Sequence, residues 1–212
     1  MTGQSIGKIY GPLRAPKIMK AQIIAEINGF ELETTPEFEM GKDNKSEEYL
    51  TKFPMGQVPS FEASNGFCLA ESGAIALYIA ELKKDTTLFG KTPDDRAKVM
   101  QFIFNTETQV DKHASTILYQ NLGYLKKDEE MAKLAYTYLD RNLEYYNNLL
   151  SNSDYLVANQ LTLADISFFF GFYYPYVKYI EEERKSKFSN VTKFMDRLSK
   201  DEKFAKVLNN AI

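Results

Sequence analysis

The most informative segment of the sequence is residues 57–72, which read Gln57-Val58-Pro59-Ser60-Phe61-Glu62-Ala63-Ser64-Asn65-Gly66-Phe67-Cys68-Leu69-Ala70-Glu71-Ser72. Two runs with alternating apolar residues flank the turn Ser64-Asn65-Gly66. An Asn-Gly turn between two such runs is the strongest short-range signal for a β-hairpin. Glu71 and Ser72 then lead into a helical pattern over 73–82. The segment therefore predicts a ββα unit.

Upstream of the hairpin, the sequence alternates between strand and helix patterns. The apolar spacing predicts a strand over 7–10, a helix over 17–27 and a strand over 31–34. The helix ends at Asn28-Gly29, a pair typical of helix C-termini. After a polar stretch, Ser46 is well placed to cap one short helical turn over 46–50. The order βαβ followed by ββα predicts a mixed sheet with helices against it.

Downstream of residue 92 the sequence shows only helical periodicity. Thr92 is a candidate helix cap, with Pro93 at the first helical position. Thr162 and Asp165 form a capping box, and Pro175 is expected to kink or end the helix that follows. The expected helices cover 95–120, 128–150, 163–180 and 190–210. We therefore expect an α/β domain over 1–82 and an all-α domain over 92–212.

The composition is that of a globular protein in a reducing compartment. The 212-residue chain has a net charge of −3, which gives no field that attracts nucleic acid. No apolar run approaches the ~20 residues of a membrane span, and residues 1–10 lack a signal-peptide pattern. One cysteine and one histidine exclude a disulfide framework and argue against a zinc site. We expect a cytoplasmic protein whose charge runs, such as 181–185, are solvated helix faces.

Pro59 lies inside a strand pattern, where proline removes a backbone donor. One interpretation is an ordinary edge-strand proline. The other is a cis Val58–Pro59 bond, which costs ~0.5–1 kcal/mol relative to trans. A cis bond would turn the Val58 amide and carbonyl outward, where they can pair with an extended peptide. This residue pair alone leaves both interpretations open.

Glu71 and Ser72 lie where the second hairpin strand enters a helix. A helix N-terminus presents unpaired amides and a partial positive charge, which suit a carboxylate. The Ser72 hydroxyl can bond that carboxylate and the Glu71 carboxylate can pair with an ammonium, as in the α-amino-acid end of a γ-glutamyl group. The alternative is that Ser72 only caps the helix. Pro59 and Glu71-Ser72 at this spacing are more specific for a ligand site than either feature alone.

Three segments together resemble the glutathione transferase superfamily over nearly the whole chain. They are Lys52 to Pro59 (KFPMGQVP), Gly66 to Ile75 (GFCLAESGAI) and Tyr155 to Ile166 (YLVANQLTLADI). One branch is the most similar, namely the transferase-like domain of the gamma subunit of eukaryotic translation elongation factor 1. The residues that indicate it are Asn44-Lys45-Ser46, Tyr49-Leu50, Lys52-Phe53-Pro54 and Gly66-Phe67-Cys68. Related fungal glutathione transferases are the other near match. The resemblance implies a thioredoxin-like first domain, a helical-bundle second domain and a homodimer.

The resemblance implies that glutathione is a co-substrate held by the first domain. The implied binding residues are Leu13, Lys45, Gln57, Val58, Pro59, Glu71 and Ser72. Glu71 and Ser72 would hold the γ-glutamyl end, and Val58 would pair with the cysteinyl backbone. Gln57 and Lys45 would meet the glycyl carboxylate, for which the lysine is a charge match.

The catalytic position departs from the family pattern. Serine-using transferases carry a hydroxyl near the start of the first helix, and an ungapped alignment from Tyr10 puts Ala15 there. A thiol with a pKa near ~8.5 then needs another group to stabilise its thiolate, and a cation can do this. Arg14 is the candidate and Lys17 the second choice, whereas the alternative makes Arg14 an ordinary solvated loop residue. The Tyr10 hydroxyl is expected to be buried in its strand.

Few residues outside the first domain can be given a role. Asn105, Tyr119 and Phe172 are candidates for a wall that holds a small apolar electrophile. The aromatic run over 168–174 is otherwise typical of a helix core. Cys68 is interpreted as an inert buried thiol, and His113 as having no functional role.

Two principal functions compete for this sequence. The first is an enzyme that conjugates glutathione to a small electrophile, or uses it to reduce one. The second is a non-catalytic interaction module of the translation elongation factor 1 complex on the same fold. A third interpretation, a glutathione-binding regulator without activity, is kept open by Ala15. The chain stops at Ile212, after the last expected helix, which favours a stand-alone enzyme unless the chain is a trimmed domain.

Overall fold

The computed structural model describes residues 5–210 of the chain, which divide into two compact units. The first unit comprises residues 5–86 together with 201–210, and the second comprises Thr87–Lys200. The last helix therefore belongs with the first unit, whereas the sequence placed it in a helical domain over 92–212. Ile212 lies outside the described residues.

The first unit is built on a four-stranded mixed sheet with the strand order β2-β1-β3-β4. Its strands are β1 (Ser5–Tyr10), β2 (Glu31–Glu33), β3 (Ser60–Ala63) and β4 (Cys68–Ala70). β1 pairs in parallel with β2 and antiparallel with β3, and β3 pairs antiparallel with β4. The Gly66 amide donates to the Ala63 carbonyl at 2.8 Å in the turn between β3 and β4. The predicted mixed sheet and hairpin are confirmed.

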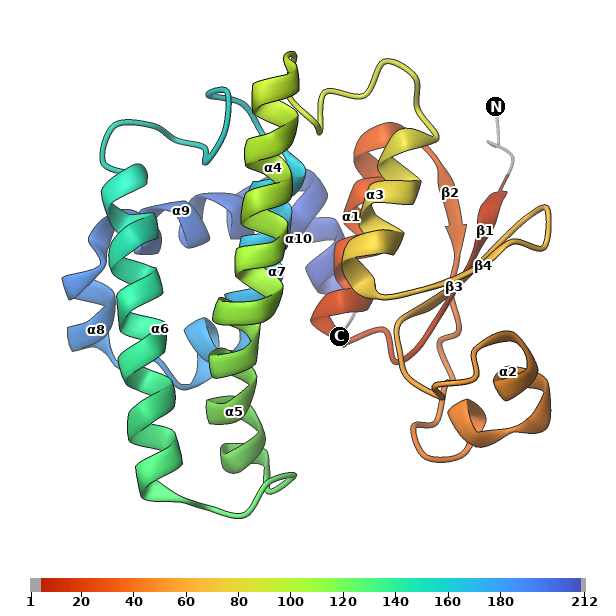
Figure 1. The fold of residues 1–212 in the computed structure, drawn as a ribbon, viewed down its shortest axis with the longest axis horizontal. Helices are drawn as coiled ribbons and strands as arrows, with labels where there is room; N and C mark the ends of the chain where they lie inside the picture. The colour runs from red at the N-terminus through yellow and green to blue at the C-terminus, as the bar shows by residue number, and fades with distance from the viewer. Residues whose placement is uncertain (1–4, 211–212) are drawn as a thin grey trace. The chain divides into compact units, whose positions relative to one another are not determined.

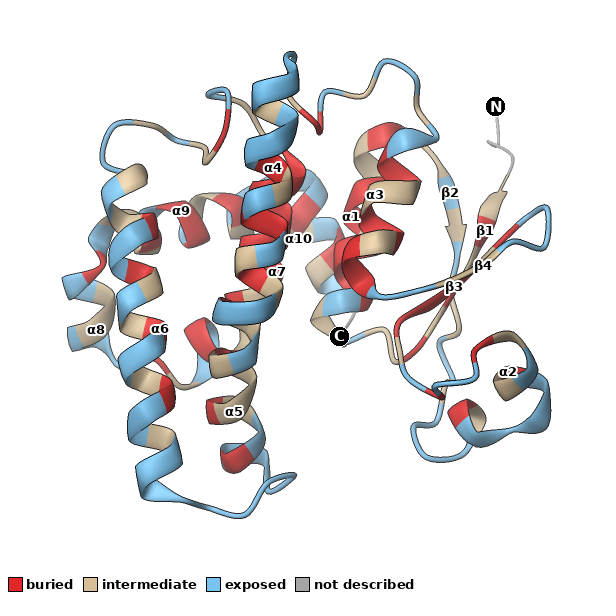
Figure 2. Ribbon diagram, viewed as in Figure 1, coloured by how far each residue is buried: buried red, intermediate tan, exposed pale blue. Residues whose placement is uncertain are grey.

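Two neighbouring helices, α1 (Pro16–Asn28) and α3 (Ser72–Glu81), pack against this sheet, and α10 (Glu202–Asn210) packs on α1 (Figure 1). Ile23 and Ile24 of α1 are completely buried in this packing, and Figure 2 shows the buried side of both helices. α1 ends at Gly29, whose left-handed backbone and amide close the last turn, as predicted. Lys206 Nζ of α10 lies 2.9 Å from the Glu26 carboxylate of α1.

The segment between β2 and β3 contains two short helices, η1 (Asp43–Lys45) and α2 (Glu47–Lys52). The Ser46 hydroxyl accepts a hydrogen bond from the Tyr49 amide at 3.2 Å, which confirms Ser46 as the cap of α2. The buried Asn44 side chain donates to the Gly56 carbonyl at 2.6 Å and so ties this segment to the loop before β3. Figure 1 shows α2 apart from the α1–α3 pair.

The second unit is helical. Its elements are α4 (Pro93–Asn105), the π-helical η2 (Thr106–Val110), α5 (Asp111–Leu122), α6 (Glu129–Leu149), α7 (Leu163–Lys178), α8 (Glu182–Lys187) and α9 (Ser189–Lys200). α7 packs against α4, α5 and α9, and most of its residues are buried (Figure 2). Its Phe168 ring stacks on the Tyr146 ring with centroids 3.9 Å apart. The aromatic run over 168–174 is therefore largely core, as expected.

Both predicted helix starts are confirmed in the second unit. Thr92 and Asp95 form a capping box at α4, and Thr162 and Asp165 form another at α7. Asp165 is completely buried and accepts hydrogen bonds from the Thr162 amide and hydroxyl and from the Leu156 amide. This carboxylate thus joins the start of α7 to the preceding loop.

Two helical segments of the second unit have an irregularity in their interior, one at η2 and one at Pro175. The helix expected over 95–120 contains the π-helical η2. Gly171 of α7 leaves the space that Thr106 of η2 occupies, because a β-carbon at Gly171 would lie only 2.6 Å from Thr106 Cγ2. α7 continues through Pro175 to Lys178, so the helix expected over 163–180 does not end at the proline. The buried side chains of Phe172 and Tyr176 hold the helix in place on both sides of the proline.

The helix expected over 190–210 is broken at Asp201. Its Oδ1 atom accepts hydrogen bonds from the Lys203 and Phe204 amides and so starts α10 as a new helix. The charge run at 181–185 overlaps α8, where Glu181, Glu182 and Glu183 are exposed as expected. Arg184, in contrast, is half-buried and pairs with Asp140, with Nε 2.7 Å from Oδ1. Among residues 5–210, no helix is long and apolar enough to cross a membrane.

Candidate functional site

A cavity of about 270 Å³ opens at the N-terminal end of α3, hereafter the α3 cavity. Five of the predicted binding residues line it, namely Gln57, Val58, Pro59, Glu71 and Ser72. Lys17 of α1, Lys52 of α2 and Cys68 of β4 line it as well. The β3–β4 hairpin thus brings the proline loop and the start of α3 together, although they are separated in the sequence.

The loop that carries Val58 and Pro59 is closely supported from behind. The Val58–Pro59 peptide bond is cis, the second of the two interpretations that the sequence left open. A β-carbon at Gly11, at the end of β1, would lie 3.2 Å from Val58 Cβ and 2.8 Å from Ile18 Cδ1. Gly11 also has a φ of +141°, so a larger residue would be both strained and too close to its neighbours.

Two hydroxyl groups fix the backbone next to this loop. The Tyr49 hydroxyl donates to the Gln57 carbonyl oxygen at 2.6 Å, and the Ser60 hydroxyl donates to the same oxygen at 3.1 Å. Tyr49 is itself 5% exposed, so the first of these bonds comes from the core of the unit. The Gln57 side chain is exposed and remains on the cavity side.

Glu71 has a strained backbone at the entry to α3. Its φ of +69° is in the region that favours glycine, which costs of order 1–3 kcal/mol for another residue. The Glu71 carbonyl accepts a hydrogen bond from the Ile75 amide at 2.9 Å, so Glu71 is the N-cap of α3. Strain of this kind persists where the surrounding structure fixes it, and here it places an exposed carboxylate beside the first turn of α3.

The sequence analysis missed Lys20, a buried lysine behind Ser72. Its Nζ atom donates to Ser72 Oγ at 3.0 Å, and the two residues are 4% and 7% exposed. An ammonium has donors only, so Ser72 Oγ is the acceptor in this contact. A charged residue on the otherwise apolar, inward face of 17–27, one turn before Ile23 and Ile24, was the signal that could have revealed it.

The other predicted site residues do not line the α3 cavity. Arg14 is exposed and Leu13 is half-buried in the turn before α1, where the Ala15 amide donates to the Pro12 carbonyl. Lys45 lies nearer to the α3 cavity than Arg14 and Leu13 do. Its Nζ atom is 3.2 Å from the position that a β-carbon would take on Gly56, which lies between the lining residues Met55 and Gln57. The second-choice cation, Lys17, is therefore the one that the structure places on the cavity.

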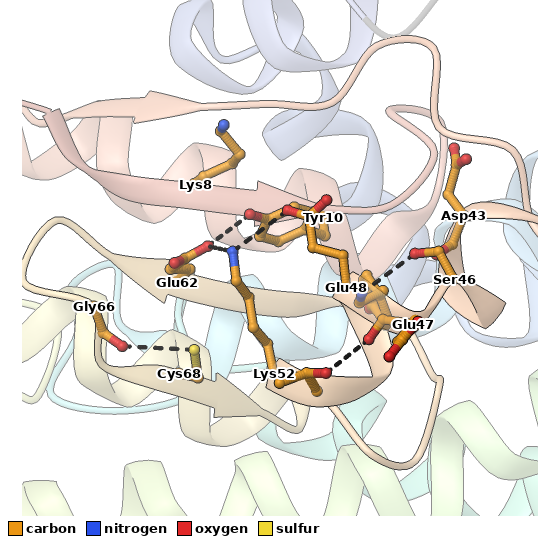
Figure 3. A network of polar contacts seen from close by, with 12 residues as sticks. Lys8, Tyr10, Asp43, Ser46, Glu47, Glu48, Lys52, Glu62, Gly66 and Cys68 are labelled. Atoms are coloured by element: carbon orange, nitrogen blue, oxygen red, sulfur yellow. Dashed lines mark hydrogen bonds and ion pairs between the residues drawn. The ribbon is translucent and has the colours of Figure 1, made fainter.

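Tyr10 is held in a polar network, which Figure 3 shows from close by. Its hydroxyl donates to Glu62 Oε2 at 2.7 Å, and Lys52 Nζ lies 2.9 Å from the same oxygen. Hydrogen bonds from Tyr10 and Lys52 lower the pKa of Glu62, and burial and Glu62 raise the pKa of Tyr10 above its ordinary value. The Tyr10 residue is half-buried rather than buried, and its hydroxyl is committed to Glu62.

Cys68 differs from the buried thiol that was expected. It is partly exposed, lines the α3 cavity and contacts the Gly66 carbonyl through Sγ at 3.6 Å (Figure 3). Burial and the nearby Glu62 carboxylate raise the pKa of this thiol. At neutral pH Cys68 is therefore a protonated thiol and a poor nucleophile. Among residues 5–210, no group of histidine, cysteine and acidic residues is arranged to hold a metal ion.

The residues singled out in the second unit occupy different environments. Phe172 is 1% exposed and contacts Phe168 and Tyr176, which is a core position. The side-chain oxygen Oδ1 of Asn105 accepts a hydrogen bond from the Tyr146 hydroxyl at 2.8 Å, so this side chain belongs to a polar network next to η2. Tyr119 is 43% exposed.

Comparison with known families settles the relationship. The family model described as glutathione S-transferase, N-terminal domain, matches residues 5–81, and the one described as glutathione S-transferase, C-terminal domain, matches residues 96–202. The chain belongs to the glutathione S-transferase family. Its first unit is accordingly the thioredoxin-like domain of that family, and its second unit supplies the helical domain.

Curated relatives of this glutathione S-transferase family member include elongation factor 1-gamma proteins. The chain is 34% identical over 191 residues to elongation factor 1-gamma 3 of Oryza sativa subsp. japonica, a match covering 90% of this chain and 46% of that protein. This chain therefore spans less than half the length of that relative, and the same is true of elongation factor 1-gamma of Artemia salina, at 36%. The elongation-factor branch expected from the sequence is supported.

Solved structures of the glutathione S-transferase family share the fold. Glutathione transferase F2 from Populus trichocarpa matches with a TM-score of 0.87 at 22% identity, over 97% of this chain and 98% of that chain. The glutathione transferase URE2P6 from Phanerochaete chrysosporium, solved in complex with oxidized glutathione, matches with a TM-score of 0.88 at 20% identity, over 100% of this chain and 98% of that chain. At these identities the likeness concerns the fold alone.

Proposed function

We propose that this protein binds glutathione in the α3 cavity and uses its thiol to attack a small electrophile. The observation that carries the proposal is the convergence of the Val58–Pro59 loop with Glu71 and Ser72 around one cavity at the start of α3. Family membership supports glutathione as the ligand. A second argument is that the site offers a match for each polar group of this tripeptide.

Each charged group of glutathione would meet hydrogen-bond donors or a side chain of opposite charge. The γ-glutamyl carboxylate would accept hydrogen bonds from the first-turn amides of α3 and from the Ser72 hydroxyl. The γ-glutamyl ammonium would pair with the exposed Glu71 carboxylate. The cysteinyl backbone would pair with Val58 as an added strand, and the glycyl carboxylate would meet Gln57 and Lys45.

Thiolate formation would rely on a cation rather than on a side-chain hydroxyl. Ala15 offers no hydroxyl, and the Tyr10 hydroxyl donates to Glu62. A lysine ammonium at Lys17, on the wall of the cavity, would stabilise the thiolate, while Arg14 remains a second candidate. The thiol proton would pass to water. The sulfur would then form a bond to the electrophilic carbon as the leaving group departs with its electron pair.

A second candidate function is favoured by the curated relatives, which are named elongation factor 1-gamma. In this alternative the chain is an interaction module of a translation elongation complex, and catalysis is absent. The same fold can serve either role. A homodimer and a cytoplasmic location, both expected from the sequence, belong to the proposal under either function.

Calorimetric titration with glutathione, paired with a conjugation assay on an aryl chloride, tests the proposal. We expect saturable binding by the wild-type protein and by Glu47→Ala, an exposed α2 variant outside the α3 cavity. Glu71→Ala should lose binding at least ten-fold. Binding with turnover would establish the enzyme, whereas glutathione binding without turnover of several electrophiles would contradict the catalytic part. No binding at all would contradict the site and favour the interaction module.

A further inference from the structure

A second and larger cavity, of about 590 Å³, lies in the first unit between the end of β1, the loop over 35–43 and α2. Among the described residues it shares only Lys52 and Phe53 with the α3 cavity. The rest of its lining comes from residues that the proposed glutathione site does not use. Its volume is typical of cavities that hold small molecules. It is hereafter the aromatic cavity.

Aromatic rings form the inner surface of the aromatic cavity. The rings are those of Tyr10, Phe38, Tyr49 and Phe53. The Tyr10 and Tyr49 rings are nearly perpendicular, at 84° with centroids 5.8 Å apart, and the Phe38 and Tyr49 rings meet at 60°. Tyr49 and Phe53 are 5% and 4% exposed, whereas Tyr10 and Phe38 are half-buried. The two half-buried rings therefore stand as walls over a buried aromatic floor.

The tyrosine hydroxyls of this cavity are already used elsewhere. The Tyr10 hydroxyl donates to Glu62, and the Tyr49 hydroxyl donates to the Gln57 carbonyl. These bonds hold both rings in fixed orientations. A ligand would therefore meet mainly the rings, whose faces carry partial negative charge and attract cations.

The rim of the aromatic cavity carries more negative than positive charge. Its carboxylates are those of Glu37, Glu39, Asp43 and Glu48. Its two lysines are both paired, Lys42 with Glu39 at 3.0 Å, and Lys52 with Glu62 at 2.9 Å and with the exposed Glu48 at 3.8 Å. Glu37 makes no hydrogen bond or ion pair with any described residue between 5 and 210. The rim therefore favours a positively charged ligand over a neutral or anionic one.

We propose that the aromatic cavity binds a small aliphatic ammonium ion, such as a short diamine. The ammonium group would lie against the Tyr10 and Phe38 rings within reach of the rim carboxylates, and its methylene chain would cover the aromatic floor. The combination of ring faces and carboxylates is the one that selects organic cations in proteins. This site would operate whether or not the α3 cavity holds glutathione.

The test uses the full chain without glutathione and the probe 1,4-diaminobutane, followed by NMR chemical shifts at low ionic strength. We expect saturable shifts centred on the loop over 35–43 and on α2, and binding that weakens as salt is raised to 0.15 M. The neutral isostere 1,4-butanediol should shift the same signals only weakly. Equal binding of the diol, or shifts that do not saturate, would overturn the proposal.

Two neighbouring glutamates on α2 give a matched pair of variants. Glu48 lines the aromatic cavity and Glu47 does not, and both are exposed. We expect Glu48→Gln to weaken diamine binding about two- to five-fold and Glu47→Gln to leave it unchanged. Phe38→Leu, which keeps an apolar side chain but removes the ring, should also weaken binding about two- to five-fold. Equal losses in Glu47→Gln and Glu48→Gln would indicate diffuse surface charge and contradict a defined site.

Discussion

Lys20 Nζ lies 3.0 Å from Ser72 Oγ, in a contact where both residues are buried. This contact joins α1 to the first residue of α3, directly behind the α3 cavity. Because the lysine can only donate, the serine oxygen serves as an acceptor toward the core. The contact therefore fixes the position of the hydroxyl that we propose as a ligand for glutathione.

A double-mutant cycle between these residues should show strong coupling. We expect Lys20→Met and Ser72→Ala each to lower the free energy of unfolding, and the double variant to lose about 1–3 kcal/mol less than the sum. The reason is that one buried hydrogen bond to a charged group is counted in both single variants. Urea unfolding measures all four proteins. Effects that add to within ~0.5 kcal/mol would contradict the coupling.

Two substitutions of Glu71 should separate backbone strain from ligand binding. The φ of +69° at this position suits glycine, so Glu71→Gly should be about 1 kcal/mol more stable toward unfolding than Glu71→Ala. Both variants lack the carboxylate and should lose glutathione affinity to the same extent. Thermal unfolding and calorimetric titration provide the two measurements. A glycine variant that is less stable than the alanine variant would argue against strain at Glu71.

The cation that activates the thiol can be identified from pH–rate profiles. If Lys17 stabilises the thiolate, Lys17→Met should move the acid limb of kcat/KM upward by about one pH unit, since one unit corresponds to about 1.4 kcal/mol. Arg14→Met should produce a smaller displacement. Lys84→Met, an exposed change in the first unit outside the α3 cavity, serves as the control. A larger displacement for Arg14→Met than for Lys17→Met would restore the arginine to that role.

The Tyr10–Glu62 bond should make stability depend on pH in a defined direction. The pKa of Glu62 is lowered in the folded protein, first by the Tyr10 hydroxyl and then by Lys52. A group with a lowered folded pKa contributes stability above its unfolded pKa of ~4.3, and this contribution is lost as the pH falls through the folded pKa. Tyr10→Phe should therefore cost about 1 kcal/mol at pH 7 and less at pH 3. Urea unfolding at both values checks this, and a cost that grows toward acid pH would refute it.

Local sequence signals predicted those elements whose ends are defined by neighbouring residues. The turn at Asn65-Gly66, the cap at Ser46 and the capping box of Thr162 and Asp165 all act within a few residues of the element they define. The meeting of Val58 with Glu71 was accessible for a related reason, because one hairpin separates them. Such features depend little on the rest of the fold.

The features that the sequence did not predict depend on distant neighbours. Lys20 is buried because Ser72 and α3 lie over it. The aromatic cavity likewise gathers Tyr10, Phe38 and Tyr49 from three separate segments. Which of Arg14 and Lys17 lines the α3 cavity was also decided by the path of the chain into α1.

The packing of α10 on α1 has a consequence for the order in which the polypeptide matures during synthesis. Thr87–Lys200 must leave the ribosome before α10 does, which takes roughly 6–23 s at ~5–20 residues per second. During this interval the part of α1 that α10 later covers is exposed to water and to other nascent chains. The first unit, whose translation begins before that of Thr87–Lys200, is thus completed only after that segment has been synthesised.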